Sequence, residues 1–311
     1  MEFEAETLQS PTGAQLSWRG LAAAQDARAT VQILHGLSEH SARYERFARY
    51  LAGRGFNVVS HDHRGHGGTR AEDAPVGVFA AKQGWKQVVE DALAVEDAAR
   101  RRFPDTPHIL FGHSMGGVIA MNHAMARKGD VAGLAVWNSN LALGGRANLM
   151  RLVLGVEGLF KPAAAPSAWM DALSFKSWGK AVKGARTDFD WLSRLPEEVD
   201  AYVADPLCGG PASISLWRDL IELAERGADE NRLLAMRKDL PVHLAAGGQD
   251  PATDKGAAMK TLAARLYNGR FTDATMRFDP QGRHETLNDE GFEAAMGDFA
   301  DWAGRAAAKT G

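Results

Sequence analysis

The fold of this chain is decided by ten residues, His108-Ile109-Leu110-Phe111-Gly112-His113-Ser114-Met115-Gly116-Gly117. Residues 108–111 form an apolar run that predicts a buried strand, and residues 118–127 have the apolar spacing of a helix. A serine on the sharp turn between them would have a strained backbone and an exposed hydroxyl. Glycines are expected on either side because a Cβ there would collide with the strand and the helix. Ser114 is therefore a candidate nucleophile.

The same alternation of short apolar runs and helical segments continues on both sides of this turn. Further strands are expected at 31–34, 57–60, 134–137, 240–246 and 275–278, and further helices at 41–53, 88–103, 257–266 and 292–303. This alternation is typical of a mostly parallel central sheet flanked by crossover helices. The predicted fold class is α/β.

The alternation stops between residues 138 and 231. This segment contains short helix-like pieces broken by Gly and Pro, with no apolar strand run followed by a crossover. The length of 311 residues is compatible with two domains or with one core that carries an insertion. Because the strand pattern resumes afterwards, we expect an α/β core from residues 1–137 and 232–311, with residues 138–231 inserted as a helical cap.

Composition narrows the possible partners and the location. The chain is 45% hydrophobic and 24% charged, and its net charge of −3 argues against nucleic acid as a partner. The acidic start, residues 1–6, lacks the pattern of a secretion signal. The most apolar stretch, residues 149–160, is shorter than the roughly 20 residues that span a membrane. The single cysteine, Cys208, cannot form an intramolecular disulfide, which favours a reducing compartment. We therefore expect a soluble, cytoplasmic protein in which Cys208 is a packed thiol.

A serine nucleophile needs a histidine base, and three histidines follow Ser114 in the chain. His123 falls within a predicted helix and His243 within a predicted strand, so both are expected to be packed. His284 lies in the loop between the last predicted strand and the last helix, from which it can reach the carboxyl edge of the sheet. His284 is the expected base.

The acid that orients the histidine is expected after a later strand. Asp250 follows closely on a predicted strand, whereas Asp254 is interpreted as the N-cap of the next helix and could substitute for Asp250. Asp279 and Glu285 are nearer to His284 in sequence, but neither stands at a strand end in a comparable loop. Asp250 is the favoured acid.

Two backbone amides are candidates for an oxyanion hole. Met115 begins the helix that follows Ser114, where the helix dipole concentrates partial positive charge. The turn His35-Gly36-Leu37 follows an earlier predicted strand and can point the amide of Leu37 toward Ser114. We therefore expect the amides of Leu37 and Met115 to hold a developing oxyanion.

Four segments together resemble the monoacylglycerol lipase and lysophospholipase-like branch of the α/β-hydrolase superfamily. They are His35-Gly36-x-x-Glu39-His40-x-x-Arg43-Tyr44, Asp62-x-Arg64-Gly65-His66-Gly67, Gly112-His113-Ser114-Met115-Gly116-Gly117, and Asp250 with His284-Glu285. The resemblance implies a serine hydrolase of acyl esters or lipids, with Ser114 as nucleophile, His284 as base and Asp250 as acid. It also implies a cap over the acyl pocket and no cofactor.

The resemblance leaves the substrate open. The family usually has Ser where this chain has Thr69, a change that preserves a hydroxyl, and cap sequences diverge widely. One alternative is a hydrolase of the same fold that acts on an amide, a peptide or a carbon–carbon bond. Another is a non-catalytic binding protein of this fold. The sequence predicts no oligomeric state.

The segment His61-Asp62-His63-Arg64-Gly65-His66 offers three imidazoles and a carboxylate that could suit a metal ion. Arg64 would repel a dication, and the spacing differs from the helical two-histidine pattern of zinc proteases, so no metal site is expected. The resemblance implies a structural loop beside the active site, in which Arg64 pairs with Asp62.

Five of the eight tryptophans lie between residues 137 and 231, namely Trp137, Trp169, Trp178, Trp191 and Trp217. In one interpretation, a small cap uses large side chains to build its own core. In the other, some of them line an apolar tunnel for an acyl chain together with Leu149, Leu152, Val153 and Phe160. An apolar cap face could also make transient contact with a membrane or micelle surface.

Overall fold

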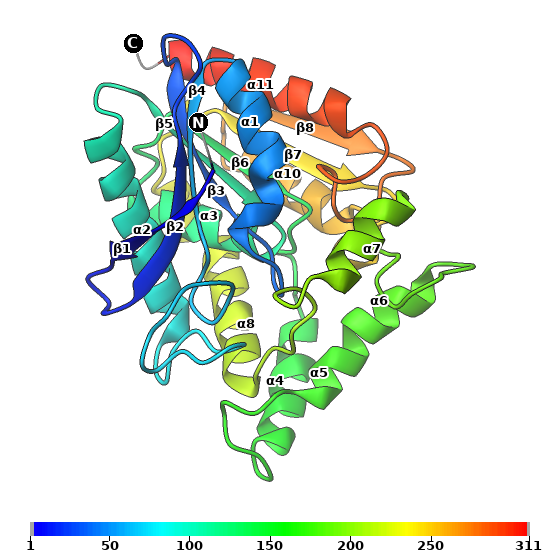
Figure 1. Cartoon of the computed structure of the whole chain (residues 1–311). Helices are drawn as coiled ribbons and strands as arrows, with labels where there is room; N and C mark the ends of the chain where they lie inside the picture. Colours follow the sequence, from blue (N-terminus) through cyan, green and yellow to red (C-terminus); the bar gives the residue numbers. More distant parts are fainter. Residues whose placement is uncertain (1–2, 310–311) are drawn as a thin grey trace.

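The computed structural model describes residues 3–309, whose strands form one eight-stranded sheet in the order β1-β2-β4-β3-β5-β6-β7-β8 (Figure 1). The strands are β1 (Ala5–Gln9), β2 (Gln15–Leu21), β3 (Ala29–Leu34), β4 (Phe56–His61), β5 (His108–His113), β6 (Gly133–Trp137), β7 (Val242–Gly247) and β8 (Ala274–Asp279). All neighbouring pairs from β4 to β8 are parallel, and only the pairs that include β2 are antiparallel. The predicted mostly parallel sheet is confirmed.

The antiparallel hairpin of β1 and β2 has no counterpart in the sequence prediction. β1 exposes four of its five residues, so it lacks the apolar run that identifies a buried strand. In β3 to β7, by contrast, every residue is buried, because helices cover the parallel part of the sheet on both faces.

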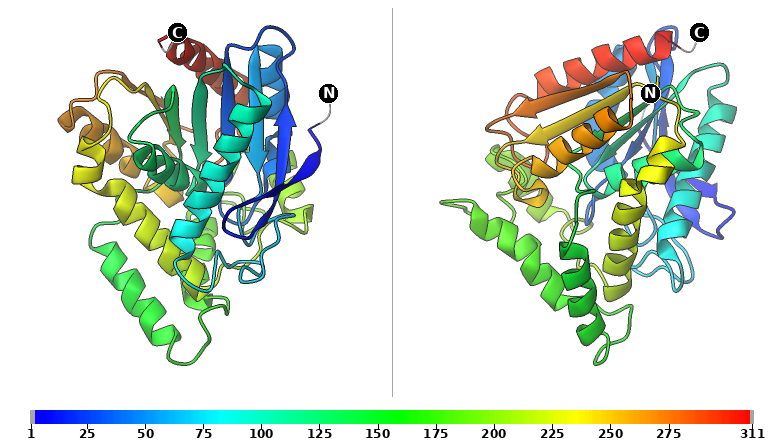
Figure 2. Two further views of the ribbon diagram at one scale, coloured as in Figure 1. Left: turned by 90° about the vertical axis from the view of Figure 1, so that its left-hand side faces the viewer. Right: turned by 180° about the vertical axis from the view of Figure 1, so that it is seen from behind.

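Two layers of helices enclose the sheet (Figure 2). On one face, α1 (Glu45–Gly53) and α11 (Phe292–Ala308) pack through a cluster that includes Phe47, Phe111 and Phe299. On the other face, α2 (Gly84–Arg102), α3 (Met115–Ala126) and α10 (Ala257–Asn268) share a second core. The five predicted core helices are therefore all present, with a short 3-10 turn before α1.

Between β6 and β7 the chain forms six helices and contributes no strand to the sheet. They are α4 (Arg146–Glu157), α5 (Ala168–Leu173), α6 (Phe175–Ala181), α7 (Pro196–Ala204), α8 (Ile214–Ala228) and α9 (Glu230–Leu234). Figures 1 and 2 show α4, α5 and α6 projecting away from the sheet, whereas α8 packs on α2 and α3. The limits 138–231 of the cap stay a prediction, and residue 231 falls inside α9. Within residues 3–309, no helix has both the length and the apolar composition needed to cross a membrane.

Candidate active site

Ser114 stands at the turn from β5 to α3 in a strained conformation. Its φ of 53° lies in the positive region that few residues other than glycine adopt. A Cβ on Gly112 would lie 2.2 Å from the carbonyl oxygen of Gly116, and a Cβ on Gly116 would lie 2.0 Å from that of Leu34. Glycine is therefore required at both positions by space, as the sequence predicts.

The favoured base and acid meet the candidate nucleophile in one hydrogen-bonded row. His284 Nε2 lies 2.9 Å from Ser114 Oγ, and His284 Nδ1 lies 2.9 Å from Asp250 Oδ2. When Nδ1–H donates to the carboxylate, Nε2 is free to accept the serine proton. The fold brings together side chains that are 170 and 34 residues apart in sequence.

Asp250 is fully buried, and its carboxylate accepts several hydrogen bonds. Its carboxylate accepts hydrogen bonds from the Thr253 hydroxyl at 2.8 Å, the Ala252 amide at 2.9 Å and the Asn138 side chain at 3.3 Å. Burial by itself raises the pKa of Asp250, but His284 and these hydrogen bonds outweigh it, so the pKa is lowered overall. Asp250 therefore stays ionised and holds the imidazole in one tautomer.

The other two histidines that follow Ser114 are packed, as expected. His123 is buried with Nε2 at 2.7 Å from Glu96. His243 Nδ1 accepts a hydrogen bond from Trp137 Nε1 at 2.9 Å.

The predicted capping role of Asp254 is wrong. Gly256 occupies the N-cap of α10, and Asp254 pairs with Arg146 of α4. The reason is the local turn, because Asp254, Lys255 and Gly256 all have positive φ and the helix begins only after them.

Leu37 and Met115 line one cavity together with Ser114. A Cβ on Gly36 would lie 3.3 Å from the Ser114 Cβ, so the turn that carries Leu37 passes in contact with the nucleophile. Met115 is buried as the first residue of α3. Both amides therefore belong to backbone beside Ser114, and their role as oxyanion donors stays a prediction.

The cavity contains about 880 Å³ of empty space, including its open mouth. Three of the predicted cap tryptophans, Trp178, Trp191 and Trp217, line it. Trp137 is instead buried in the sheet, and Trp169 is 48% exposed. Further apolar lining comes from Val118, Leu143, Met150, Phe175, Leu192, Leu220, Ile221 and Ala224.

None of the four other predicted tunnel residues lines the cavity, which corrects the sequence interpretation. Leu149, Leu152 and Phe160 are 58%, 64% and 80% exposed. The opposite side of α4, which carries Met150 and Leu154, faces the interior. Sequence alone identified α4 as apolar but could not decide which side faces inward. Val153 is partly buried against the core.

A buried ion-pair cluster lies beside the row of Ser114, His284 and Asp250. The Arg43 guanidinium donates to Glu39 at 2.6 Å and to both oxygens of Glu285 at 2.6 and 2.8 Å. Although burial opposes it, these carboxylates raise the pKa of Arg43 well above its usual range. Arg43 therefore joins the first sequence motif to the residue that follows His284. The sequence motifs contain these three residues but do not reveal that they pair.

Glu39 also supports the turn that carries Leu37. Its Oε1 accepts hydrogen bonds from the Gly36 amide at 2.5 Å and from the Tyr44 hydroxyl at 2.8 Å. His113 contributes from the other side, with Nδ1 at 3.4 Å from Glu39 and Nε2 at 3.0 Å from the carbonyl oxygen of His284. Although burial lowers the pKa of His113, the hydrogen bond with Glu39 raises it overall. Through these two contacts His113 connects the two loops.

The expected pairing of Arg64 with Asp62 is wrong. The Asp62 carboxylate already accepts from the amide and hydroxyl of Ser41 and from the Gly68 amide. Arg64 instead donates to Asp73 at 2.8 Å. Because local donors saturate Asp62, the guanidinium pairs with a different carboxylate.

The histidines of the same loop are buried and packed against one another. The His63 ring centroid lies 4.2 Å from that of His35 and 4.7 Å from that of His61. Burial lowers the pKa of His61 to about 3 and that of His66 to about 4, so both are neutral at physiological pH. Thr69 uses its hydroxyl in this loop, donating to the Asp62 carbonyl oxygen at 2.5 Å.

Cys208 is a partly buried thiol in the cap. Burial, together with nearby carboxylates, raises the pKa of Cys208 to about 12. A thiol in this state is a poor nucleophile, in keeping with the expectation from the sequence.

The sheet order, the strained serine after β5 and the hydrogen-bonded row of Ser114, His284 and Asp250 are those of the α/β-hydrolase fold. Residues 25–291 match the family described as Serine aminopeptidase, S33, and the chain belongs to this family. The resemblance to the α/β-hydrolase superfamily is confirmed.

Characterised relatives and solved structures agree with this assignment. Human monoglyceride lipase is 36% identical over 255 residues, which cover 78% of this chain and 75% of the relative. The monoacylglycerol lipase of Mycolicibacterium smegmatis is 26% identical over 283 residues, which cover 89% and 88%. A carboxyl esterase from Bacillus coagulans superposes with a TM-score of 0.88 at 22% identity over 99% of each chain. This last likeness is one of fold.

Proposed function

We propose that this α/β-hydrolase is a carboxylic ester hydrolase that cleaves acyl esters of the monoacylglycerol and lysophospholipid type. The observation that carries the proposal is His284, whose two nitrogens lie 2.9 Å from Ser114 Oγ and from Asp250 Oδ2 beside an apolar cavity. The monoglyceride lipases among the relatives support the same class of substrate.

The geometry accounts for a two-step acyl transfer. Ser114 Oγ attacks the ester carbonyl while His284 Nε2 takes its proton, and Asp250 stabilises the resulting imidazolium. The amides of Leu37 and Met115 hold the oxyanion. His284 then gives the proton to the leaving alcohol, and a water molecule activated by the same imidazole cleaves the acyl-enzyme. None of these steps needs a group beyond the protein and water.

The cavity favours an acyl chain over the N-terminus of a peptide, although the family is described as one of aminopeptidases. A peptide ammonium group would need a free carboxylate near the nucleophile. The carboxylates that line the cavity are Glu39 and Glu285, and both already pair with the buried Arg43, so neither is free to bind an ammonium group. The tryptophans and aliphatic side chains of the cavity instead fit a hydrocarbon chain.

The cap also carries features suited to a lipid surface. Within residues 3–309, thirteen large hydrophobic side chains are exposed, and seven of them lie between residues 149 and 173. They are Leu149, Leu152, Val156, Leu159, Phe160, Trp169 and Leu173. We propose that this apolar face of the cap makes transient contact with a membrane or micelle that holds the substrate. The protein would reach that surface from the cytoplasm, a location that its single thiol favours.

The experiment that tests the proposed activity combines active-site labelling with a substrate panel. A fluorophosphonate probe is expected to label the wild-type protein and not Ser114→Ala, because only an activated serine reacts. Monoacylglycerols and p-nitrophenyl esters of increasing acyl length are expected to be hydrolysed much faster than aminoacyl amides. A folded protein that stays unlabelled would support a non-catalytic role, and a preference for amides would overturn the assignment as an esterase.

A further inference from the structure

Ser38, in the loop that carries Leu37, makes several hydrogen bonds to the cap. The Ser38 hydroxyl donates to the carbonyl oxygen of Gly210 at 2.6 Å. Its own carbonyl oxygen accepts from the Gly209 amide and from the Tyr202 hydroxyl, both at 2.9 Å. The segment from residue 202 to residue 210 therefore packs directly on the loop after β3.

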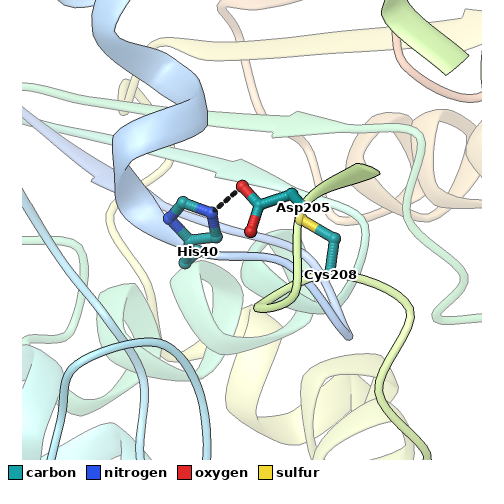
Figure 3. Close-up of side chains that lie close together, drawn as sticks. All are labelled: His40, Asp205 and Cys208. Atoms are coloured by element: carbon teal, nitrogen blue, oxygen red, sulfur yellow. Dashed lines mark hydrogen bonds and ion pairs between the residues drawn. The ribbon is translucent and has the colours of Figure 1, made fainter. Parts of the chain in front are cut away.

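Three side chains with metal-binding atoms meet at this junction (Figure 3). His40 comes from the loop after β3, whereas Asp205 and Cys208 come from the cap. His40 Nε2 lies 2.9 Å from Asp205 Oδ2. One ligand atom from each of the three residues lies within 4.8 Å of the other two. Among the described residues, this group therefore places a nitrogen, an oxygen and a sulfur atom around one point.

The three atoms are the kinds that Zn²⁺ prefers. Zinc binds imidazole nitrogen and carboxylate oxygen at about 2.0–2.2 Å and thiolate sulfur at about 2.3 Å, so tetrahedral ligand atoms lie roughly 3.2–3.7 Å apart. His40 and Asp205 already have nearly this separation. Every pair of the three atoms lies within 4.8 Å, so a contraction of about 1 Å or less completes the set.

The surroundings of the three residues also favour a cation. Asp205 Oδ1 accepts a hydrogen bond from the Leu207 amide at 2.8 Å, which orients the carboxylate as an outer-shell partner does. The Asp205 side chain is 30% exposed, so water can reach the fourth coordination position. Asp205 itself brings a negatively charged oxygen to the group.

We propose that His40, Asp205 and Cys208 bind one divalent cation of the zinc class, which fastens the cap to the loop that carries Leu37. On binding, the S–H bond of Cys208 breaks and its proton passes to solvent. The hydrogen that His40 Nε2 shares with Asp205 Oδ2 is exchanged through solvent to Nδ1, so lone pairs of nitrogen, oxygen and sulfur bind the cation without a change of oxidation state. The site differs from the row of Ser114, His284 and Asp250, and it does not depend on the proposed esterase activity.

A Co²⁺ titration of the whole, reduced protein tests the site without reference to activity. Cobalt coordinated by a thiolate gives a near-ultraviolet charge-transfer band, and Cys208 is the single cysteine, so the band can come only from this residue. We expect the band to saturate at one equivalent and to disappear when Zn²⁺ displaces Co²⁺. Absence of the band in the wild-type protein would overturn the proposal.

Substitutions distinguish a cation site with three ligands from binding by the Cys208 thiol alone. Cys208→Ser is expected to abolish the band, and His40→Gln and Asp205→Asn are each expected to weaken Co²⁺ binding at least about tenfold. Asp239→Asn, at an exposed carboxylate outside the group, should bind as the wild type does. Thermal unfolding of each apo variant checks that it is folded. Unchanged affinity in folded His40→Gln and Asp205→Asn would overturn the three-ligand site.

Discussion

Around Ser114 the polar side chains are buried and joined by hydrogen bonds. Glycine occupies the positions at which a Cβ would lie near 2 Å from a carbonyl oxygen. Helices α4 to α6 of the cap are built differently, with large apolar side chains in solvent and open space around Gly155. The proposed chemistry requires a backbone held in one arrangement, whereas the proposed contact with lipid requires only an apolar surface. Substitutions in the two regions should therefore differ in the kind of effect as well as in its size.

The largest effect is expected from Ser114→Ala. Without the nucleophile, turnover of a p-nitrophenyl ester should fall by about 10³-fold to 10⁶-fold, while the melting temperature stays within a few degrees of the wild type. Ser177→Ala, at an exposed cap position, is the matched control and should leave turnover unchanged. Substantial turnover by folded Ser114→Ala would assign the chemistry to another residue.

The second effect concerns stability and compares one glycine from each region. Gly116→Ala places a Cβ 2.0 Å from the Leu34 carbonyl oxygen and should lower the free energy of unfolding by about 2–4 kcal/mol. Gly155→Ala adds a methyl group to α4 with no neighbour within 4 Å and should raise it by about 0.5–1 kcal/mol. Urea unfolding measures both. Equal effects of the two substitutions would contradict the contrast between the regions.

The third effect is a loss of stability at acidic pH, which we expect to arise from buried histidines of the core. Burial lowers the pKa of His61 to about 3, of His108 to about 3 and of His66 to about 4, whereas a histidine in the unfolded chain titrates near 6.5. Between pH 6.5 and pH 4 the unfolded chain therefore binds more protons than the folded one. The free energy of unfolding should be highest above pH 6.5 and should fall as the pH is lowered toward 4.

The cap adds no histidine to this titration, because residues 138–231 contain none. Burial raises the pKa of Asp219 in the cap to about 6, and this carboxyl acts in the opposite direction, adding stability as the pH falls. The urea midpoint should be lower at pH 5 than at pH 7.5. In His66→Gln, which removes one of the buried imidazoles, the midpoint should depend less steeply on pH over this range. A midpoint that rises on acidification would contradict the assignment of neutral buried histidines.

The smallest effect is expected at the exposed apolar face of the cap. Leu159 and Phe160 are 78% and 80% exposed, and replacing both by Ser should weaken binding to phospholipid vesicles by about tenfold or less. Turnover of a short, soluble ester should not change, because neither side chain lines the cavity. Tyr267→Ser, at an equally exposed position on α10, is the control. Equal vesicle binding by the cap variant and the wild type would remove the support for a lipid-facing cap.

The sequence by itself was sufficient for the features that depend on local pattern. A strand, a glycine-flanked serine and a helix in succession are recognised within the twenty residues 108–127, because the turn leaves no space for a Cβ. The choice of Asp250 and His284 followed from chain order, because loops after parallel strands meet at one edge of the sheet. These side chains do meet there, within hydrogen-bond distance of one another.

Only the tertiary structure decided which side chains face one another across the chain. Arg43 pairs with Glu285 from 242 residues away, and Arg64 pairs with Asp73 instead of Asp62. The outward direction of Leu149 on α4 was equally inaccessible to sequence reasoning. Periodicity shows that a helix has an apolar side, and charge shows that a side chain needs a partner. The neighbour that meets that side or satisfies that charge depends on how distant segments pack.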